Sequence, residues 1–176
     1  MKKQGFTLIE LMVVIVIMGI LAAVAVPKLF GMIAKSKASE VGPAAGEYVK
    51  LQDAYVAEKG IRVGNWKEIG YLMKNSSNYY YCDQAKGTAC TSGNNRDGHG
   101  STGTFVDYDF TATWTATNIA TLNDCNANSN WSLTTSGNSS AGGLVTYTAT
   151  VDNQDNVAGG SCEVLTPNFL RLHTAS

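Results

Sequence analysis

The sequence predicts an α+β fold in which one long N-terminal helix packs against a small antiparallel sheet. Three features of the chain lead to this prediction. A long apolar run comes first, a helical spacing of apolar residues continues it to about residue 59, and strand-like alternation follows only after residue 100. The 176 residues are enough for one domain with its own hydrophobic core.

The first part of the chain is a short basic tag followed by an apolar segment. Residues 1–5 read MKKQG, and residues 6–26 contain a single charged side chain, that of Glu10. As a helix, this segment is about 31 Å long, close to the thickness of the hydrocarbon core of a bilayer. Because two lysines precede the segment, the positive-inside rule places the N-terminus in the cytoplasm. We therefore expect a transmembrane helix over residues 6–27.

The helical pattern continues past the apolar segment. Over residues 28–59, apolar side chains recur at helical spacing, with charged side chains between them. This spacing predicts an amphipathic second half of the same helix, and Gly60 suits the position that follows its last residue. Pro27 and the Gly42–Pro43 pair are expected to kink or loosen the helix, because each proline removes a backbone donor.

Residues 60–176 are expected to form an α+β head domain. Asn65 can cap a short helix over Trp66–Lys74. A polar loop over Asn75–Gly103 follows, in which Tyr79–Tyr81 would anchor the loop to the sheet.

Alternation of apolar and polar side chains predicts the strands of the head. It is clearest in Phe105–Thr117 and Leu144–Val151, where the polar positions are mostly threonine or aspartate. Such alternation is typical of an antiparallel strand with one buried face. Weaker strand candidates lie at Trp131–Thr135 and Ser161–Leu165, and the segments between the candidates are rich in turn-forming Asn, Gly and Ser.

The charge of the chain is low and unevenly placed. Charged residues make up 15% of the sequence, and the formal net charge is −1. From Gly60 onward, six Lys and Arg stand against nine Asp and Glu, a net charge of −3. A polar, mildly acidic head is typical of an exported surface domain, and it lacks the basic excess that nucleic-acid binding requires. We therefore expect no nucleic-acid partner.

The four cysteines all lie in the head, and none is part of a CxxC pair. This spacing argues against a zinc ribbon or a thioredoxin-type site and favours two disulfides formed in an oxidising compartment. Four cysteines allow three pairings, and their spacing does not decide rigorously among them. We predict Cys82–Cys90, which closes a short loop, and Cys125–Cys162, which fastens the C-terminal segment to the sheet. Buried free thiols are the alternative.

Residues 5–27, GFTLIELMVVIVIMGILAAVAVP, closely resemble the class III signal sequence of type IV pilins and of type II secretion pseudopilins. The likeness rests on a short basic leader over residues 1–5, Gly5 before the cut, Phe6 after it, and Glu10 as the fifth residue of the mature chain. It is strong over the first 30 residues or so. Beyond them, the resemblance is one of architecture.

The resemblance implies how the N-terminus is processed. A membrane-bound prepilin peptidase would cut between Gly5 and Phe6 on the cytoplasmic side and methylate the new Phe6 amine. A carboxylate at Glu10 within lipid costs on the order of 3 kcal/mol, so it needs a compensating partner. We expect that partner to be the Phe6 ammonium of a neighbouring subunit, which would set the register of assembly.

The resemblance also implies a structural role rather than an enzymatic one. The chain would be a pilus subunit that polymerises with its own copies and with minor pilins, through an inner-membrane assembly platform. It would lie in the cytoplasmic membrane before assembly and in an extracellular filament afterwards, used for adhesion, motility or uptake. We expect no catalytic residue, cofactor or metal.

Other interpretations of the N-terminus and of the whole chain remain open. A Sec signal peptide could be cut after Ala23–Val24–Ala25, although the apolar segment is longer than such peptides and contains an acid. A plain membrane anchor would make Glu10 incidental. Among filament proteins, the alternatives are a pseudopilin of a type II secretion system and a DNA-binding uptake pilin, the second being disfavoured by the acidic head.

Several weaker signals in the head receive a structural interpretation. Asp152, Gln154 and Asn156 alternate as in a calcium loop, but Val157 stands where such a loop needs glycine, so a polar turn is favoured. Glycosylation triplets begin at Asn75, Asn130 and Asn138, in a composition where such triplets are common, and His99 and His173 have no metal-ligand pattern around them.

Overall fold

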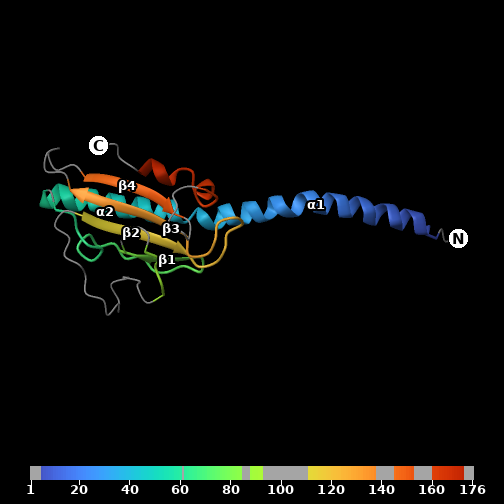
Figure 1. Cartoon of the computed structure of the whole chain (residues 1–176), viewed down its shortest axis with the longest axis horizontal. Helices are drawn as coiled ribbons and strands as arrows, with labels where there is room; N and C mark the ends of the chain where they lie inside the picture. The colour runs from blue at the N-terminus through green and yellow to red at the C-terminus, as the bar shows by residue number, and fades with distance from the viewer. Residues whose placement is uncertain are drawn as a thin grey trace.

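The computed structural model describes residues 5–60, 62–84, 88–92, 111–137, 145–152 and 160–172. Two helices, α1 (Leu8–Ala38) and α2 (Val41–Lys59), follow one another along a gently curved rod. The rest of the described chain packs around α2 as a head, and most of α1 projects from it (Figure 1). The α+β class expected from the sequence is confirmed.

Ser39 and Glu40 separate the two helices. Pro43 explains the interruption: it cannot donate a hydrogen bond to the carbonyl of Ser39, four residues earlier, and its ring crowds that carbonyl. Gly42 and Pro43 themselves lie in the first turn of α2. Pro27 lies inside α1, which continues through it.

The far end of α2 is closed by a glycine. Gly60 has φ of 88°, and its N–H donates to the carbonyl of Val56 at 2.8 Å. Because a left-handed φ is strained for residues with a Cβ, glycine suits this position. The expected helix end at Gly60 is confirmed.

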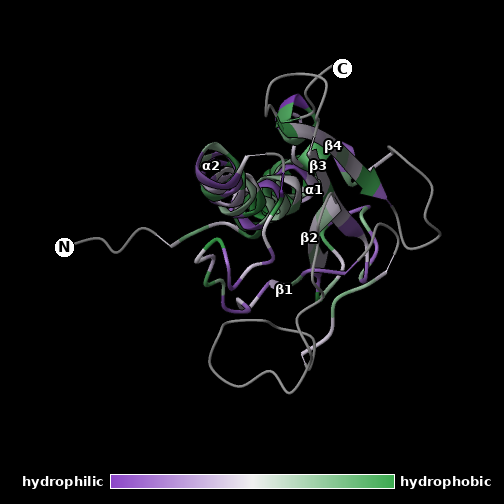
Figure 2. Ribbon diagram, turned by 90° about the vertical axis from the view of Figure 1, so that its left-hand side faces the viewer, coloured by the Kyte–Doolittle hydropathy of each residue, from purple (hydrophilic) through white to green (hydrophobic). Residues whose placement is uncertain are grey.

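The head contains a four-stranded antiparallel sheet whose spatial order equals the order in the chain. The strands are β1 (Tyr79–Cys82), β2 (Thr111–Asn118), β3 (Asn130–Gly137) and β4 (Val145–Asp152). The view along the rod shows the helices on one side of this sheet (Figure 2). Two short 3₁₀ helices, η2 (Glu163–Leu165) and η3 (Phe169–Leu172), complete the described chain.

The core lies between α2 and the inner face of the sheet. Every second residue of β2 and β4 points into it, as the alternation predicted, with Ala112, Trp114 and Ala116 almost wholly buried in β2. Aromatic rings fill much of the space. Ring centroids lie 5.4–6.1 Å apart in the pairs Tyr79–Trp131, Tyr81–Trp114 and Trp114–Phe169.

The polar end of each tryptophan has a partner, which removes the main cost of burying an indole N–H. Trp66, Trp114 and Trp131 are all at most 1% exposed. Their Nε1 groups donate to the carbonyl of Thr113 at 3.2 Å, the hydroxyl of Tyr71 at 2.9 Å and the hydroxyl of Thr166 at 2.7 Å, respectively.

Gln52 is a buried polar side chain of α2 that joins three parts of the head. Its Nε2 donates to the Tyr48 hydroxyl at 3.1 Å and to the Gly64 carbonyl at 2.5 Å, and its Oε1 accepts from the Gly64 N–H at 3.1 Å. The Tyr48 hydroxyl also lies 3.1 Å from Thr135 Oγ1 of β3. A Cβ on Gly64 would come within 2.6 Å of Ile69 Cγ2, so the close approach requires glycine.

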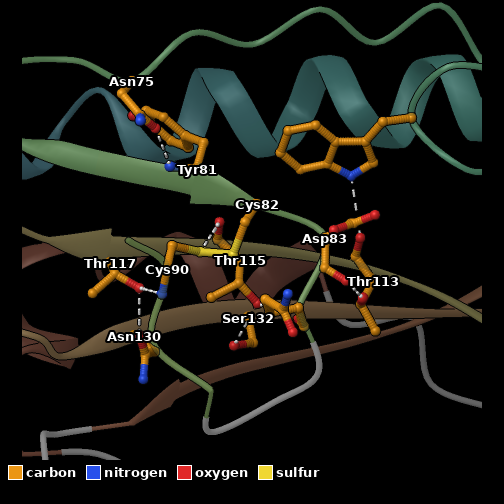
Figure 3. Close-up of a disulfide and its surroundings, with 12 residues drawn as sticks. Asn75, Tyr81, Cys82, Asp83, Cys90, Thr113, Thr115, Thr117, Asn130 and Ser132 are labelled. Atoms are coloured by element: carbon orange, nitrogen blue, oxygen red, sulfur yellow. Dashed lines mark hydrogen bonds between the residues drawn. A yellow bond between two sulfur atoms is a disulfide. The ribbon is translucent and has the colours of Figure 1, made fainter. Parts of the chain in front are cut away.

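The outer face of the sheet is also partly buried, contrary to the expectation of one buried face. Thr115 and Thr117 of β2 are fully buried although they point away from the core. The segment that follows β1 lies over them: Cys90 N–H donates to Thr117 Oγ1 at 2.8 Å, and Thr115 donates to the carbonyl of Gln84 at 2.9 Å (Figure 3). Threonine suits these positions because it favours strands and because its hydroxyl can form a hydrogen bond with the backbone that covers it.

The helix expected over Trp66–Lys74 is wrong beyond its first turn. Asn65 does cap it, accepting from the Glu68 N–H at 3.0 Å and donating its own N–H to the Glu68 carboxylate at 2.8 Å. The turn ends at Gly70, where φ is 71° and Tyr71 N–H returns to the Trp66 carbonyl at 2.8 Å. This is the geometry of a glycine helix stop.

Two further expectations for the head are corrected. Tyr79–Cys82, expected within a loop, is the edge strand β1. Ser161–Leu165, a weak strand candidate, forms a turn and the 3₁₀ helix η2, in which Thr166 N–H donates to the Glu163 carbonyl at 3.0 Å. Residues 105–110 and Leu144 lie outside the described residues, and the weak candidate at Trp131–Thr135 is confirmed as part of the longer β3.

Candidate processing and assembly site

The described chain starts at Gly5, and the expected processing residues stand clear of the head. Phe6 is 78% exposed, and, apart from the chain neighbours of Gly5, no atom of the described residues lies within 4 Å of the position that a Cβ on Gly5 would occupy. Thr7 has extended backbone angles, and α1 begins at the next residue. The Gly5–Phe6 bond therefore precedes the first turn of α1 and is sterically open to a protease.

Glu10 caps the start of α1 together with Thr7. The Glu10 Oε2 atom accepts from the Thr7 backbone N–H at 2.9 Å and from the Thr7 hydroxyl at 2.7 Å. In return, Thr7 Oγ1 accepts from the Glu10 backbone N–H at 3.4 Å. This reciprocal arrangement is a capping box, and it turns the carboxylate toward the N-terminus.

Thr7 was not among the residues singled out from the sequence, although a signal for it existed. Residues 7–10 read TLIE, which fits the pattern of Ser or Thr followed three positions later by Glu, directly before an apolar run. The structure brings Thr7 and Glu10 together and leaves Phe6 without a contact to the carboxylate among the described hydrogen bonds.

The apolar half of α1 is exposed along its whole length. Large hydrophobic side chains from Phe6 to Ile33 are between 42% and 83% exposed, and this helix is long and apolar enough to cross a membrane. Ala34 and Ala38 are the first buried residues of the rod. An exposed apolar surface of this extent must be covered by lipid or by protein.

The rod is fixed to the head by hydrogen bonds as well as by packing. Tyr71 donates to the Ala44 carbonyl at 3.0 Å. Tyr147 of β4 donates to the Val49 carbonyl at 3.1 Å and to Asp53 Oδ1 at 2.6 Å. Burial raises the pKa of both tyrosines, and the neighbouring Asp53 carboxylate raises that of Tyr147 further. Both phenols therefore remain hydrogen-bond donors at neutral pH.

The four cysteines form two buried disulfides in the structure. Cys82–Cys90 joins the end of β1 to the segment that covers the outer face of the sheet (Figure 3). Cys125–Cys162 joins the connection between β2 and β3 to the residue before η2. The second disulfide lies at the base of the head, by which we mean residues 121–125 and 161–165, beside α1. Here η2 contacts α1.

The weaker signals of the sequence fall in places that give them little support. Asp152 ends β4 and is buried, while the other two residues of the candidate calcium loop lie outside the described residues. In the described part of the chain, no three His, Cys, Asp or Glu side chains are grouped as a metal site would require. Asn130 is 2% exposed within β3, so a glycan could not be accommodated there. Asn75 binds the Tyr81 N–H through its amide oxygen at 2.9 Å.

The remaining residues named from the sequence, Asn138, His99 and His173, lie outside the described residues.

Comparison with known proteins finds a family profile at the N-terminus and similarity to several filament proteins over part of the chain. Residues 1–26 match the family profile of the prokaryotic N-terminal methylation motif. The chain is 36% identical over 89 residues to the type IV major pilin protein PilA of Myxococcus xanthus strain DK1622, a match that covers 51% of this chain and 40% of that protein. It is 46% identical over 59 residues to the fimbrial protein EcpC of Eikenella corrodens, covering 34% and 39%, respectively.

A secretion protein is similar as well. The type II secretion system core protein G of Escherichia coli strain K12 is 49% identical over 53 residues, which is 30% of this chain and 34% of that protein. These matches span about two-fifths or less of each relative's own length. No solved structure matches the chain significantly. The resemblance predicted from residues 5–27 is confirmed: the chain carries the prokaryotic N-terminal methylation motif in a segment similar to type IV pilins.

Proposed function

We propose that this chain is a structural subunit of a type IV pilus, cut after Gly5 by a prepilin peptidase and N-methylated at Phe6. The observation that carries the proposal is the exposed apolar half of α1, which follows an accessible Gly5–Phe6 bond. The match of residues 1–26 to the methylation motif and the partial similarity of the chain to pilins support it. The filament would serve adhesion, motility or uptake.

The exposed helix suits both environments that a pilin occupies. Before assembly, lipid covers its apolar side chains; in the filament, helices of neighbouring copies cover one another. The head needs no help from the projecting half of α1, because its core is closed by α2, the sheet and Phe169. A subunit can therefore leave the bilayer without unfolding its head.

Glu10 would direct the order of assembly. Its carboxylate lies about one turn into the helix, and in the free chain it is bound by Thr7. The ammonium group of a neighbour's Phe6, created by cleavage, is the charged partner that the apolar environment otherwise lacks. We expect the incoming subunit to advance until this pair forms, which sets the axial step between subunits.

Membrane protein partners would act before the filament exists. Prepilin peptidase and the inner-membrane assembly platform would meet the chain with its N-terminus on the cytoplasmic side, and minor pilins would join the same polymer. The role would be structural, as the partial similarity to pilins suggests.

The similarity to the E. coli secretion protein favours one second candidate, a pseudopilin of a type II secretion system. Both candidates share processing at Gly5–Phe6, so processing alone does not separate them. Deleting this subunit would separate them: a pilin deletion removes surface filaments seen by electron microscopy, whereas a pseudopilin deletion leaves them and stops protein secretion into the medium.

Mass analysis of the mature chain tests the processing step directly. Protein recovered from cells is expected to begin at Phe6 with a methylated amine. A mature chain beginning at Val26 would instead indicate a Sec signal peptide and would overturn the proposal.

A further inference from the structure

The base of the head lies close to the end of the apolar segment of α1. From Leu8 to Val26 the helix rises about 27 Å, which is close to the thickness of the hydrocarbon core of a bilayer. Lys28 follows two residues later, and from Lys28 to Lys35 the helix rises only about 10 Å. When α1 spans a membrane, these two lysines are therefore at the level of the phospholipid headgroups.

A cleft of about 450 Å³ lies between this part of α1 and the base of the head. Its lining includes Lys28, Met32 and Lys35 of α1, and Asp124, Ser161 and Val164 of the head. The Cys125–Cys162 disulfide and a 2.6 Å hydrogen bond from the Ser161 hydroxyl to the Asp124 carbonyl hold the head side of the cleft together.

Two apolar side chains of the cleft, Met32 and Val164, are mainly exposed, whereas Leu165 packs against the core. Val164 of η2 is 63% exposed, and Met32 is 70% exposed. In the described head, two large hydrophobic residues are mainly exposed, Val164 and Leu72. The apolar surface of α1 thus continues onto η2 at the base of the head.

The charges around the cleft match a membrane surface. Lys28, Lys35 and Lys37 are exposed, and no carboxylate within the described residues forms an ion pair with them. The base of the head also contains two acids, Asp124 and Glu163, which leaves one positive charge in excess. Lysines beside exposed apolar side chains are typical of protein surfaces that contact anionic lipid.

We propose that, before assembly, the base of the head docks onto the outer leaflet of the membrane that α1 spans, with Lys28 and Lys35 on phospholipid phosphates and with Met32 and Val164 between them at the level of the headgroups. The inference rests on the proposed membrane insertion of α1. It adds a second contact, which fixes the orientation of the head on the bilayer.

A neighbouring copy is the other possible occupant of the cleft, and its charges fit less well. The only acid of a second subunit's apolar segment is Glu10, and the proposed pair with a Phe6 ammonium occupies it, so that segment offers no further anion to the lysines of the cleft. The lipid headgroups supply that anion, and they are adjacent to Lys28 whenever α1 spans the bilayer.

Depth-dependent quenching tests the contact on the full chain. The chain is reconstituted, without assembly proteins, in vesicles of phosphatidylcholine and phosphatidylglycerol that contain lipid brominated near the headgroup. Because the three native tryptophans are buried, a tryptophan introduced by Val164→Trp reports on its own surroundings. We expect the Val164→Trp emission to be strongly quenched.

Leu72→Trp is the matched control, since Leu72 is 59% exposed. The neighbouring Tyr71 binds the Ala44 carbonyl, and Ala44 lies about 24 Å further along the rod than Lys28. We therefore expect the brominated lipid to quench the emission of the Leu72→Trp variant only weakly. Equal quenching of the two variants, in protein that resists alkaline extraction, would overturn the docked head and leave the membrane span intact. Release of the protein by alkaline extraction would overturn both.

The lysines provide an independent measurement. Lys28→Gln with Lys35→Gln is expected to lower the ratio of docked to undocked heads by about five-fold for each lysine removed, and only in vesicles that contain phosphatidylglycerol. Lys50→Gln, on the exposed side of α2, is the control that should change nothing. If quenching of the Val164→Trp emission by brominated lipid falls as the ratio of protein to lipid rises, a second copy occupies the cleft and the proposal is refuted.

Discussion

The hydroxyl of Thr7 lies 2.7 Å from the Glu10 carboxylate and donates a hydrogen bond to it. The only acid of the apolar segment therefore has a partner within its own subunit. Because an unpaired carboxylate in lipid is costly, this bond lowers the cost of holding Glu10 in the membrane before a neighbour arrives. Assembly would then exchange one partner for another.

Replacing Glu10 tests this exchange. Glu10→Leu is expected to give a stable, inserted protein that forms few or no filaments, because it removes the partner of the neighbouring Phe6 amine while lowering the cost of insertion. Glu10→Asp should be partly active, since it keeps the charge on a shorter side chain. The measurement is filament yield by shearing and electron microscopy at matched expression.

Leader removal serves as the internal control for these variants and is expected to be unchanged, because the cut lies several residues from Glu10. Thr7→Val keeps the shape of residue 7 and removes only its hydroxyl, so it should reduce filament yield less than Glu10→Leu does. Normal filament yield from Glu10→Leu would show that Glu10 is not the assembly contact.

Removing each disulfide should destabilise the head to a different extent. The loops closed by Cys82–Cys90 and Cys125–Cys162 have sequence separations of 8 and 37, so loop entropy gives about 2.5 and about 4 kcal/mol, respectively. Urea unfolding of the full chain in detergent, followed by tryptophan fluorescence, measures the two paired Cys→Ser variants. Non-reducing peptide mapping of the wild type provides the pairing, and a peptide joining Cys82 to Cys162 would contradict it.

Gln52 is expected to be among the most sensitive polar residues of the head. Gln52→Leu leaves the N–H and carbonyl of Gly64 without their buried partner and should cost about 2–4 kcal/mol of unfolding free energy. Lys50→Gln, two residues earlier on the exposed side of α2, should change it by less than about 0.5 kcal/mol. Similar urea midpoints for the two variants would mean that the Gly64 segment does not depend on Gln52.

The buried tyrosines predict a loss of stability in alkali. Burial raises the pKa of Tyr71, Tyr79, Tyr81 and Tyr147, so these phenols stay neutral in the folded chain while their unfolded counterparts ionise near pH 10. Their contribution is complete below about pH 10 and is lost as the pH rises further, by up to about 1.4 kcal/mol per pH unit for each phenol. Unfolding free energies between pH 8 and about 11 measure this slope.

Two phenylalanine variants separate the cost of the hydroxyl from its benefit. Tyr79 OH is buried with no hydrogen-bond partner in the described part of the chain, so Tyr79→Phe should match or exceed the wild-type stability at pH 7 and have a shallower alkaline slope. Tyr147→Phe loses the bonds to Asp53 and Val49 and should cost about 1–3 kcal/mol. The reverse ranking at pH 7 would contradict these assignments.

Much of the fold could be predicted because the relevant signals are local. The apolar run before Pro27, the alternation in β2 and β4, and the glycine at position 60 each express their structure within a few residues. The capping box of Thr7 and Glu10 is also local, so it could have been predicted from the sequence although it was not.

The unpredicted parts depend on residues that are distant in the sequence. Nothing in Tyr79–Cys82 distinguishes an anchoring loop from an edge strand until β2 is placed beside it. Thr115 is a residue type common at solvent-facing positions, yet it is buried, and its hydroxyl donates to the carbonyl of Gln84, which follows β1. The 3₁₀ turn at Glu163–Leu165 follows a cysteine that is bound to Cys125, a constraint that local propensity does not contain.

The order of the strands has a consequence for biogenesis. Because each strand pairs with the one before it in the chain, a head whose residues cross the membrane in chain order, after α1 has inserted, can add strands in the sequence in which they emerge. Phe169, which packs on Trp114, arrives last. The head would thus remain incomplete until Phe169 has crossed the membrane, and only subunits exported that far would present a finished surface to the assembly machinery.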